Sequence, residues 1–168
     1  MKLRDKLKLM FIVFFINYII DRITKLLAVK YLQGKDYRFL GDLFRLTYIE
    51  NEGAFLGMGS NLSDILQPLL LIILPLVFLV LGFLYCIYRE NDKLAIIYLT
   101  SIIAGGVANI QDRIFNYGKV IDFLNFGIGP NFRTGILNTA DMSITFGAIL
   151  FVIYEFKRTK KTDHKTIN

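Results

Sequence analysis

Two aspartates of this 168-residue sequence occupy positions that suit acid/base chemistry. Asp122 lies in the segment Gly118–Phe123, and Asp141 begins an apolar run that ends near Phe156. An ionisable group in or against a membrane segment is costly and by default indicates a functional site. Two carboxyls brought together there can share one proton and act as acid and base. We therefore take Asp122 and Asp141 as a candidate catalytic pair, although either one alone would suit a solvated loop or a helix cap.

Two further groups of polar residues accompany this pair. Asp21 and Lys25 are four residues apart, so on a helix they can form an ion pair that simply stabilises its end. Asn109 and Asp112 share a helix face, and Arg113 can neutralise Asp112 or reach a carbonyl or a lipid phosphate. A purely structural polar cluster is one interpretation of the second group. Because three such polar residues gather at one helix end, we favour the interpretation that they form a wall of a functional site.

The composition indicates the kind of scaffold that must position these residues. The chain is 54% hydrophobic with a mean hydropathy of +0.48, and residues 66–88 contain no charge. Such a run is long enough to cross a hydrocarbon core of roughly 30 Å. We predict an all-α membrane protein forming a single domain over residues 1–168, with helices that span the membrane at about 9–29, 66–88, 94–111 and 135–156.

The basic residues predict the orientation of these helices. Lysines and arginines cluster before the first apolar run and after the last, so both termini are expected to be cytoplasmic. The first run resembles a cleaved signal peptide, but no small-x-small site follows it and Asp21 interrupts it, which favours an uncleaved helix. The connections at about 30–65 and 112–134 then face outward, and the candidate carboxylates lie near the outer interface.

The first outward connection has features of a small sheet. Residues 37–49 are rich in aromatic and β-branched side chains with partial alternation, which predicts strands on the outer membrane surface. Residues 53–60 are rich in glycine and suit a flexible segment that approaches a ligand closely.

Several other kinds of chemistry are disfavoured by the composition. The net charge of +6 comes with basic clusters that flank helices, which indicates topology signals and lipid contacts rather than nucleic-acid binding. One cysteine, Cys86, permits no internal disulfide, and together with the single His164 it supplies too few ligands for a structural zinc site. A nucleophile assisted by histidine would need that histidine near the membrane core, but His164 lies in the charged tail. Carboxylates remain as the expected hydrolytic groups, with no metal or cofactor.

Five segments, in order along the chain, resemble those of the bacterial lipoprotein signal peptidases, or type II signal peptidases. Residues 21–25 (DRITK) resemble D-x-x-T-K, 51–57 (NEGAFLG) resemble N-x-G-A-A-F/W-G, and 105–113 (GGVANIQDR) resemble G-G-x-x-G-N-x-x-D-R. Residues 118–123 (GKVIDF) resemble G-x-V-x-D-F, and 137–141 (LNTAD) resemble F-N-x-A-D. Phe55, Ala108 and Leu137 depart from these patterns, but no carboxylate or key asparagine does.

This resemblance implies an intramembrane aspartic endopeptidase of the bacterial cytoplasmic membrane. Its substrates would be prolipoproteins, cleaved before the diacylglyceryl-cysteine, and its other expected partner is membrane lipid. Asp122 and Asp141 match the catalytic dyad, and a flexible element over the site is expected at about 124–134. We expect a monomer that needs no cofactor. The positions that match substrate-binding or supporting residues are Asp21, Lys25, Asn51, Gly53, Asn109, Asp112, Arg113, Asn138 and Ala140.

Two other functions remain open from the residues alone. Buried carboxylates in a helical bundle also relay protons or bind cations in small transporter subunits. That function predicts broken helices or carboxylates spread through the membrane depth. A non-catalytic assembly scaffold is the second alternative, and it would need no pair of aspartates in one cleft.

Overall fold

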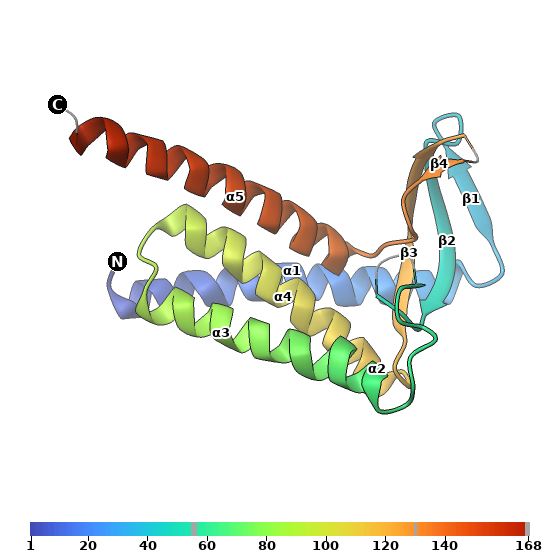
Figure 1. Cartoon of the computed structure of the whole chain (residues 1–168). Helices are drawn as coiled ribbons and strands as arrows, with labels where there is room; N and C mark the ends of the chain where they lie inside the picture. Colours follow the sequence, from blue (N-terminus) through green and yellow to red (C-terminus); the bar gives the residue numbers. More distant parts are fainter. Residues whose placement is uncertain (55–56, 130, 167–168) are drawn as a thin grey trace.

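A bundle of long helices, with a small sheet across one end, makes up the protein (Figure 1). The computed structural model describes residues 1–54, 57–129 and 131–166. The helices are α1 (Leu3–Tyr31), α2 (Leu66–Pro68), α3 (Leu74–Tyr88), α4 (Lys93–Phe115) and α5 (Thr139–Thr166), and a π-helical turn, η2 (Leu69–Ile73), joins α2 to α3. The strands are β1 (Asp36–Phe39), β2 (Phe44–Asn51), β3 (Val120–Ile128) and β4 (Phe132–Arg133).

Helix α4 is the centre of the bundle and packs against α1, α3 and α5. Small residues make this close packing possible. A Cβ atom at Gly105 would lie 2.5 Å from the Ala140 carbonyl oxygen, and one at Gly106 would lie 2.7 Å from the Leu79 side chain. Helix α5 therefore approaches α4 at its own first turn, which is where Asp141 is located.

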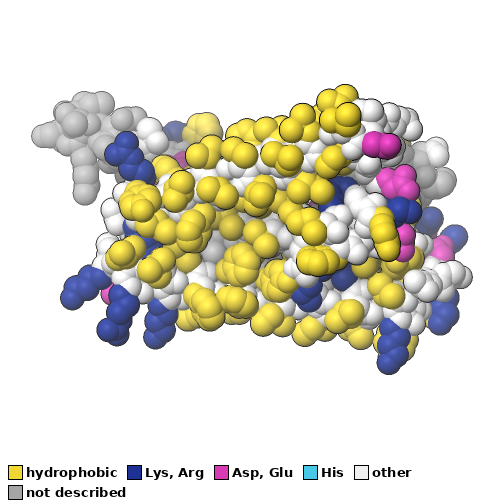
Figure 2. Space-filling model, turned by 90° about the horizontal axis from the view of Figure 1, so that it is seen from below, with side chains coloured by type: hydrophobic (Ala, Val, Ile, Leu, Met, Phe, Trp, Pro, Cys, Tyr) yellow, Lys and Arg dark blue, Asp and Glu magenta, His cyan; other side chains and the backbone are white. Residues whose placement is uncertain are grey.

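The outer surface of the bundle is apolar. Hydrophobic side chains cover the middle of the molecule, and Lys and Arg side chains gather at its two ends (Figure 2). Among the described residues, three helical segments are long and apolar enough to cross a membrane: Leu66–Tyr88, Lys93–Phe115 and Thr139–Lys160. Helix α1 is longer, but Asp21, Arg22 and Lys25 lie within its apolar run.

The sheet is built from both long connections. Its described strands are antiparallel in the order β1-β2-β3-β4. The sequence prediction assigned the sheet to residues 30–65 alone and expected a flexible element at 124–134. In the structure, residues 124–128 of that segment belong to β3 and residues 132–133 to β4, so both connections contribute strands.

The helix boundaries differ from the predicted ones near the site. Helix α4 continues through Phe115, so Asp112 and Arg113 lie on a helix rather than in the predicted loop at 112–134. Helix α5 begins at Thr139 rather than 135, because Leu137 instead exchanges backbone hydrogen bonds with Leu124 of β3. The predicted helix at 66–88 contains the π-helical turn η2, which lies between two prolines that cannot donate backbone hydrogen bonds.

The start of α1 and the last turns of α5 lie at the end of the bundle opposite the sheet (Figure 1). The turn between α3 and α4 also lies there, and Asp92 begins α4 by accepting hydrogen bonds from the N–H groups of Leu94 and Ala95. The polar residues that the sequence analysis selected lie at the other end, where the helices meet the sheet.

Candidate active site

A cleft of about 260 Å³ opens where α4, α5, η2 and the sheet meet. One part of its lining is polar and comprises Asn51, Asn109, Arg113, Asp122 and Asp141. The other part is apolar and includes Leu70, Leu71, Pro75, Ile136, Leu137 and Ile144. A polar reaction site therefore lies directly beside a surface that suits hydrocarbon.

Asp122 is held on β3 by two amide donors. It is 2% exposed. Asn51 lies diagonally across from it on β2 and donates from Nδ2 to Asp122 Oδ2 at 2.9 Å, while Asn138 Nδ2 donates to Oδ1 at 2.6 Å. Burial, together with the nearby Asp141 charge, raises the pKa of Asp122 to about 6, even though both amide hydrogen bonds lower it. This carboxyl can therefore hold a proton close to neutral pH.

Asp141 is held by the start of α5. Asn138 and Asp141 form a reciprocal capping box: Asn138 Oδ1 accepts the Asp141 N–H at 2.8 Å, and Asp141 Oδ2 accepts the Asn138 N–H at 3.0 Å. The other carboxylate oxygen, Oδ1, accepts a hydrogen bond from Asn109 Nδ2 at 2.8 Å. The helix start thus fixes the position of Asp141 at the cleft.

Asn138 links the two carboxylates. Its backbone N–H binds Asp141, and its side-chain amide binds both Asp122 and the Asn109 carbonyl oxygen, the latter at 3.1 Å. Because Asn138 is fully buried, these contacts are shielded from solvent. Asp122 and Asp141 are therefore brought to one cleft through a shared neighbour, and the structure places no cation in an ion pair with either of them among the described residues.

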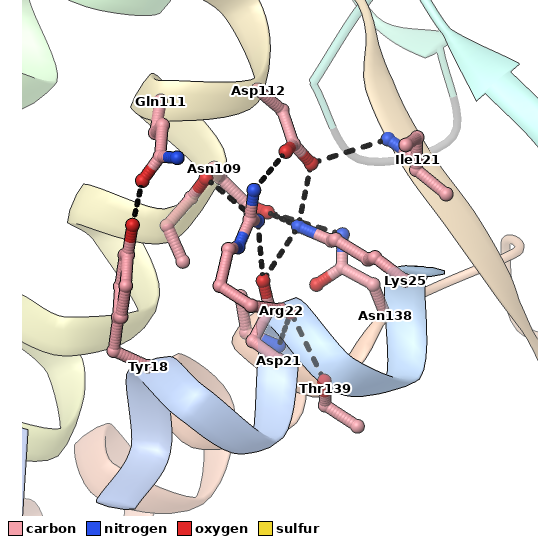
Figure 3. A network of polar contacts seen from close by, with 12 residues as sticks. Tyr18, Asp21, Arg22, Lys25, Asn109, Gln111, Asp112, Ile121, Asn138 and Thr139 are labelled. Carbon is pink, nitrogen blue, oxygen red and sulfur yellow. Dashed lines mark hydrogen bonds and ion pairs between the residues drawn. The ribbon is translucent and has the colours of Figure 1, made fainter. Parts of the chain in front are cut away.

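Behind the cleft lies a cluster in which charges are matched: Asp21, Arg22 and Lys25 of α1 with Asp112 of α4. Figure 3 shows Arg22 and Lys25 reaching from α1 toward Asn109 and Asp112. Lys25 Nζ lies 3.0 Å from Asp21, 2.7 Å from Asp112 and 2.9 Å from the Asn109 oxygen. Arg22 contacts Asp21 and Asp112, each at 2.6 Å. Two carboxylates and two cations balance one another here, which is how proteins tolerate buried charge.

The two acids of this cluster also hold the segments that carry the candidate pair. Asp21 Oδ1 accepts the Ala140 N–H at 2.9 Å and the Thr139 hydroxyl at 3.0 Å, so it caps α5 from a neighbouring helix. Asp112 Oδ2 accepts the Ile121 N–H at 3.4 Å. The two backbone contacts, at Ala140 and Ile121, each fall on the residue immediately before a cleft aspartate.

Arg113 contacts backbone carbonyls rather than a carboxylate. Its guanidinium donates to the Gly118 oxygen at 2.7 Å and the Gly53 oxygen at 2.6 Å. A Cβ atom at Gly53 would lie 2.3 Å from the backbone of Gly57, so glycine is required at this turn. The sequence suggested Asp112, a carbonyl or a lipid phosphate as the partner of Arg113. In the structure its hydrogen bonds go to backbone carbonyls. Phe55, which departs from the family pattern, lies outside the described residues.

The predicted site residues fall into two groups in the structure. Those that line the cleft are Asn51, Gly53, Asn109, Arg113, Asp122 and Asp141. Those packed behind it are Asp21, Lys25, Asp112, Asn138 and Ala140. Sequence reasoning missed Arg22 and Thr139, although Arg22 follows Asp21 directly and lies three residues before Lys25. It also missed the apolar wall of the cleft, because an uninterrupted apolar run shows no pattern that marks it.

A buried carboxylate, Asp122, and a half-buried one, Asp141, at one cleft can act as a general acid and a general base on a peptide bond. Together with the apolar helices, this arrangement defines the class of an aspartic hydrolase of membranes. The sequence also matches the family described as signal peptidase (SPase) II over residues 13–157.

Relatives with established names agree with this class. The lipoprotein signal peptidase of Borrelia hermsii is 38% identical over 156 residues, which is 89% of this chain and 91% of the relative. That of Clostridium tetani is 35% identical, with 92% and 96% of the two chains covered. The chain therefore belongs to the signal peptidase II family, and it is an aspartic protease of that family. The resemblance stated from the sequence is confirmed, and the peptidase is favoured over the transporter and scaffold alternatives.

Solved structures share the fold. One bacterial membrane enzyme superposes with a TM-score of 0.78 at 24% identity, covering 90% of each chain. A second gives a TM-score of 0.76 at 23% identity, covering 88% of this chain and 92% of its own. The combination of a helical bundle with a small antiparallel sheet is thus found in bacterial membrane enzymes.

Proposed function

We propose that Asp122 and Asp141 are the catalytic dyad of this peptidase. One observation carries the assignment: two carboxylates from different elements line one cleft, share Asn138 as a donor and have amide groups rather than cations as partners. Like charges so placed resist joint ionisation, so one carboxyl holds a proton while the other stays charged.

The chemistry follows from that shared proton. The charged carboxylate takes a proton from a water molecule, whose oxygen attacks the scissile carbonyl carbon. The protonated carboxyl donates its proton to the carbonyl oxygen. When the C–N bond breaks, the proton taken from water passes to the leaving amine. Asn109 supports this step by orienting Asp141, and Arg113 and Gly53 shape the turn beside the cleft.

Removal of signal peptides from prolipoproteins is the activity that family membership assigns. We place the cleaved bond immediately before the diacylglyceryl-cysteine. The apolar wall of the cleft supports this placement, because Leu70, Leu71 and Ile144 lie beside the aspartates and suit acyl chains. The lipid part of the substrate would stay in contact with hydrocarbon while the peptide bond meets water.

We assign the protein to the bacterial cytoplasmic membrane. We propose that α1 crosses the membrane in addition to the three apolar segments Leu66–Tyr88, Lys93–Phe115 and Thr139–Lys160, which makes four spanning segments. The burial of Asp21 and Lys25, at 1% and 2% exposed, supports this count because their charges face protein rather than lipid. Basic residues at both termini, together on one end of the bundle, support a cytoplasmic location for that end. The sheet and the cleft then face the outer surface. A single chain contains every proposed site residue, so we assign a monomer as the working unit.

The test is cleavage of a purified diacylated prolipoprotein by wild type, Asp122→Asn and Asp141→Asn in detergent or proteoliposomes. Each variant should lose activity by about 10²-fold to 10⁴-fold, the range for loss of an acid/base group. Asp64→Asn is the matched control, because Asp64 is exposed and lies outside the cleft. Near-normal processing by both cleft variants would refute the dyad. A non-acylated substrate cleaved equally well would refute the placement of the lipid.

A further inference from the structure

The two members of the proposed dyad have unequal surroundings, although each accepts two hydrogen bonds. Asp122 lies on a strand, and its donors are the side-chain amides of Asn51 and Asn138. Asp141 lies in the first turn of a helix, and its donors are a backbone N–H and the amide of Asn109. Unequal surroundings around two coupled carboxyls decide where the shared proton resides.

We propose that the resting dyad carries its proton on Asp122 and its charge on Asp141, and that Lys25 imposes this asymmetry through Asn109. The inference rests on the proposed dyad and assigns each member its role. It makes Lys25 a positioning residue, because it acts on the dyad through another side chain.

The start of α5 favours charge on Asp141. The first turn of a helix presents unpaired N–H groups and the positive end of the helix dipole, both of which stabilise an anion. Asp141 is the acidic member of the capping box with Asn138, so its Oδ2 accepts one of these N–H groups at 3.0 Å. Asp122 has no such helix end, because it is the third residue of strand β3.

Lys25 determines which way the Asn109 amide faces. The Asn109 oxygen accepts hydrogen bonds from Lys25 Nζ at 2.9 Å and from Asn138 Nδ2 at 3.1 Å. The opposite orientation would place the NH₂ group against an ammonium, which has no acceptor to offer it. The NH₂ group is therefore directed at Asp141, where it donates at 2.8 Å. A cation bound to the amide oxygen also polarises the amide and strengthens its donor.

The other charges near the dyad do not reverse this asymmetry. Asp21 and Asp112 are each bound to both Arg22 and Lys25, so their negative charge is matched within the cluster. Arg113 lies beside both aspartates, but its contacts are with backbone carbonyls. Burial raises the pKa of Asp122 to about 6, so this carboxyl is largely protonated when the pH is at or below that value.

The roles in hydrolysis then follow. Asp141 is the general base that takes a proton from the attacking water. Asp122 is the general acid that gives its proton to the carbonyl oxygen, and both of its oxygens keep their amide donors. When the C–N bond breaks, Asp141 passes the water proton to the leaving amine, and the proton on the former carbonyl oxygen returns to Asp122 as the new carboxylic acid forms.

The test is a pH titration of the full protein labelled with ¹³C at the aspartate carboxyl carbons and followed by NMR. The two signals are assigned by their loss in Asp122→Asn and in Asp141→Asn. In wild type, most of the shift change near pH 6 should fall on Asp122. An equal division, or a larger share on Asp141, would overturn the assignment. The readout needs no turnover, so it is independent of the cleavage assay that tests the dyad itself.

The role of Lys25 is tested by Lys25→Gln with Arg22→Gln as its matched control. Both variants remove one positive charge from the same cluster, but only Lys25 contacts Asn109. In Lys25→Gln, a measurable part of the pH-dependent shift change should move from Asp122 to Asp141. In Arg22→Gln, the share of the shift change on each aspartate should stay as in wild type.

A second variant covers the case in which Lys25→Gln does not fold. Asn109→Ala keeps the cation and removes the amide that connects it to Asp141. It should redistribute the titration in the same direction. An unchanged division in Asn109→Ala, or the same redistribution in Arg22→Gln, would show that Lys25 has no specific role in positioning.

Discussion

The charge-matched cluster behind the cleft and the aspartate pair inside it use the same residue type in opposite ways. Asp21 and Asp112 are bound to Arg22 and Lys25 at distances of 2.6 to 3.0 Å. Within the described part of the chain, the hydrogen-bond partners of Asp122 and Asp141 are N–H donors from amide side chains or backbone. Matched charges stabilise a buried geometry, whereas an unmatched carboxyl is free to bind and release a proton.

The two regions are adjacent because the cluster binds the backbone that carries the cleft aspartates. Asp21 binds the backbone next to Asp141, and Asp112 binds the backbone next to Asp122. The cluster thereby holds in position two carboxyls that would repel each other if both were charged. We infer that catalysis requires both regions, one for reactivity and one for position.

Breaking the cluster should give the largest loss of stability. Asp21→Ala leaves Arg22 and Lys25 short of a partner and removes the acceptor at the start of α5. Loss of one member of a buried ion pair costs about 3–5 kcal/mol. Thermal unfolding in detergent should show this loss, and the amount of protein in the membrane should fall.

Asp36→Ala provides the matched control for that measurement. Its ion pair with Arg38 is solvent-exposed, so its removal should cost less than about 1 kcal/mol. A fully stable Asp21→Ala protein that has lost all turnover would contradict the supporting role of the cluster.

Removing the charge of Asp122 should increase stability, whereas removing a charge from the cluster decreases it. The effect should appear in the pH dependence of the free energy of unfolding. The pKa of Asp122 is raised from 3.8 to about 6 in the folded protein, so the folded state binds this proton more tightly than the unfolded state does. Stability should therefore increase as the pH falls from about 6 toward 3.8, by up to about 3 kcal/mol from this group.

Asp122→Asn should lack this contribution, because an amide does not titrate. Unfolding midpoints of wild type and variant, measured across that pH range, should converge toward low pH as the wild type gains stability. Parallel midpoints at every pH would show that Asp122 has no unfavourable charge in the folded protein.

The seam between α4 and α5 should give the smallest of these effects, and it connects the two regions. A Cβ atom at Gly105 would lie 2.5 Å from the Ala140 oxygen, so Gly105→Ala should push the start of α5 away from α4. Overpacking of this kind costs about 1–3 kcal/mol. Activity should fall as well, because Asn109 on α4 would separate from Asp141 on α5.

Gly82→Ala is the control, because the nearest atom to a Cβ there is 3.8 Å away. It should be neutral or stabilising by about 0.5–1 kcal/mol, as for alanine in a helix interior. Both variants are compared in an unfolding assay and a cleavage assay. Equal effects at the two glycines would show that close packing of α4 against α5 is not required.

Much of the fold was predictable because apolar runs and basic flanks are strong signals. The start of α5 was predicted too early, since residues 135–137 are as compatible with an extended segment as with a helix. The Asn138-x-x-Asp141 pattern is a capping signature that marks the observed start. The predicted span at 94–111 stopped short of Asp112 and Arg113, whereas α4 continues through Phe115 and both side chains have partners inside the protein.

The sequence predicted which residues belong to the candidate site better than it predicted which of them line the cleft and which lie behind it. Family motifs selected the carboxylates and asparagines, and the structure places them within one connected region. The contacts between elements were not predictable, because no spacing rule connects Asp21 with Ala140 or Lys25 with Asn109. Arg22 was missed for the same reason: its partner Asp112 lies on another helix.

The most direct test of the contrast between the two regions is a paired measurement on Asp122→Asn and Asp112→Asn. Unfolding temperature and prolipoprotein cleavage are recorded on the same purified samples. Asp122→Asn should keep or raise its unfolding temperature and lose cleavage by at least about 10²-fold. Asp112→Asn should unfold at a lower temperature, and it should retain measurable turnover per folded molecule when assayed below that temperature. An Asp122→Asn protein that cleaves normally, beside a stable Asp112→Asn protein that does not, would contradict the account.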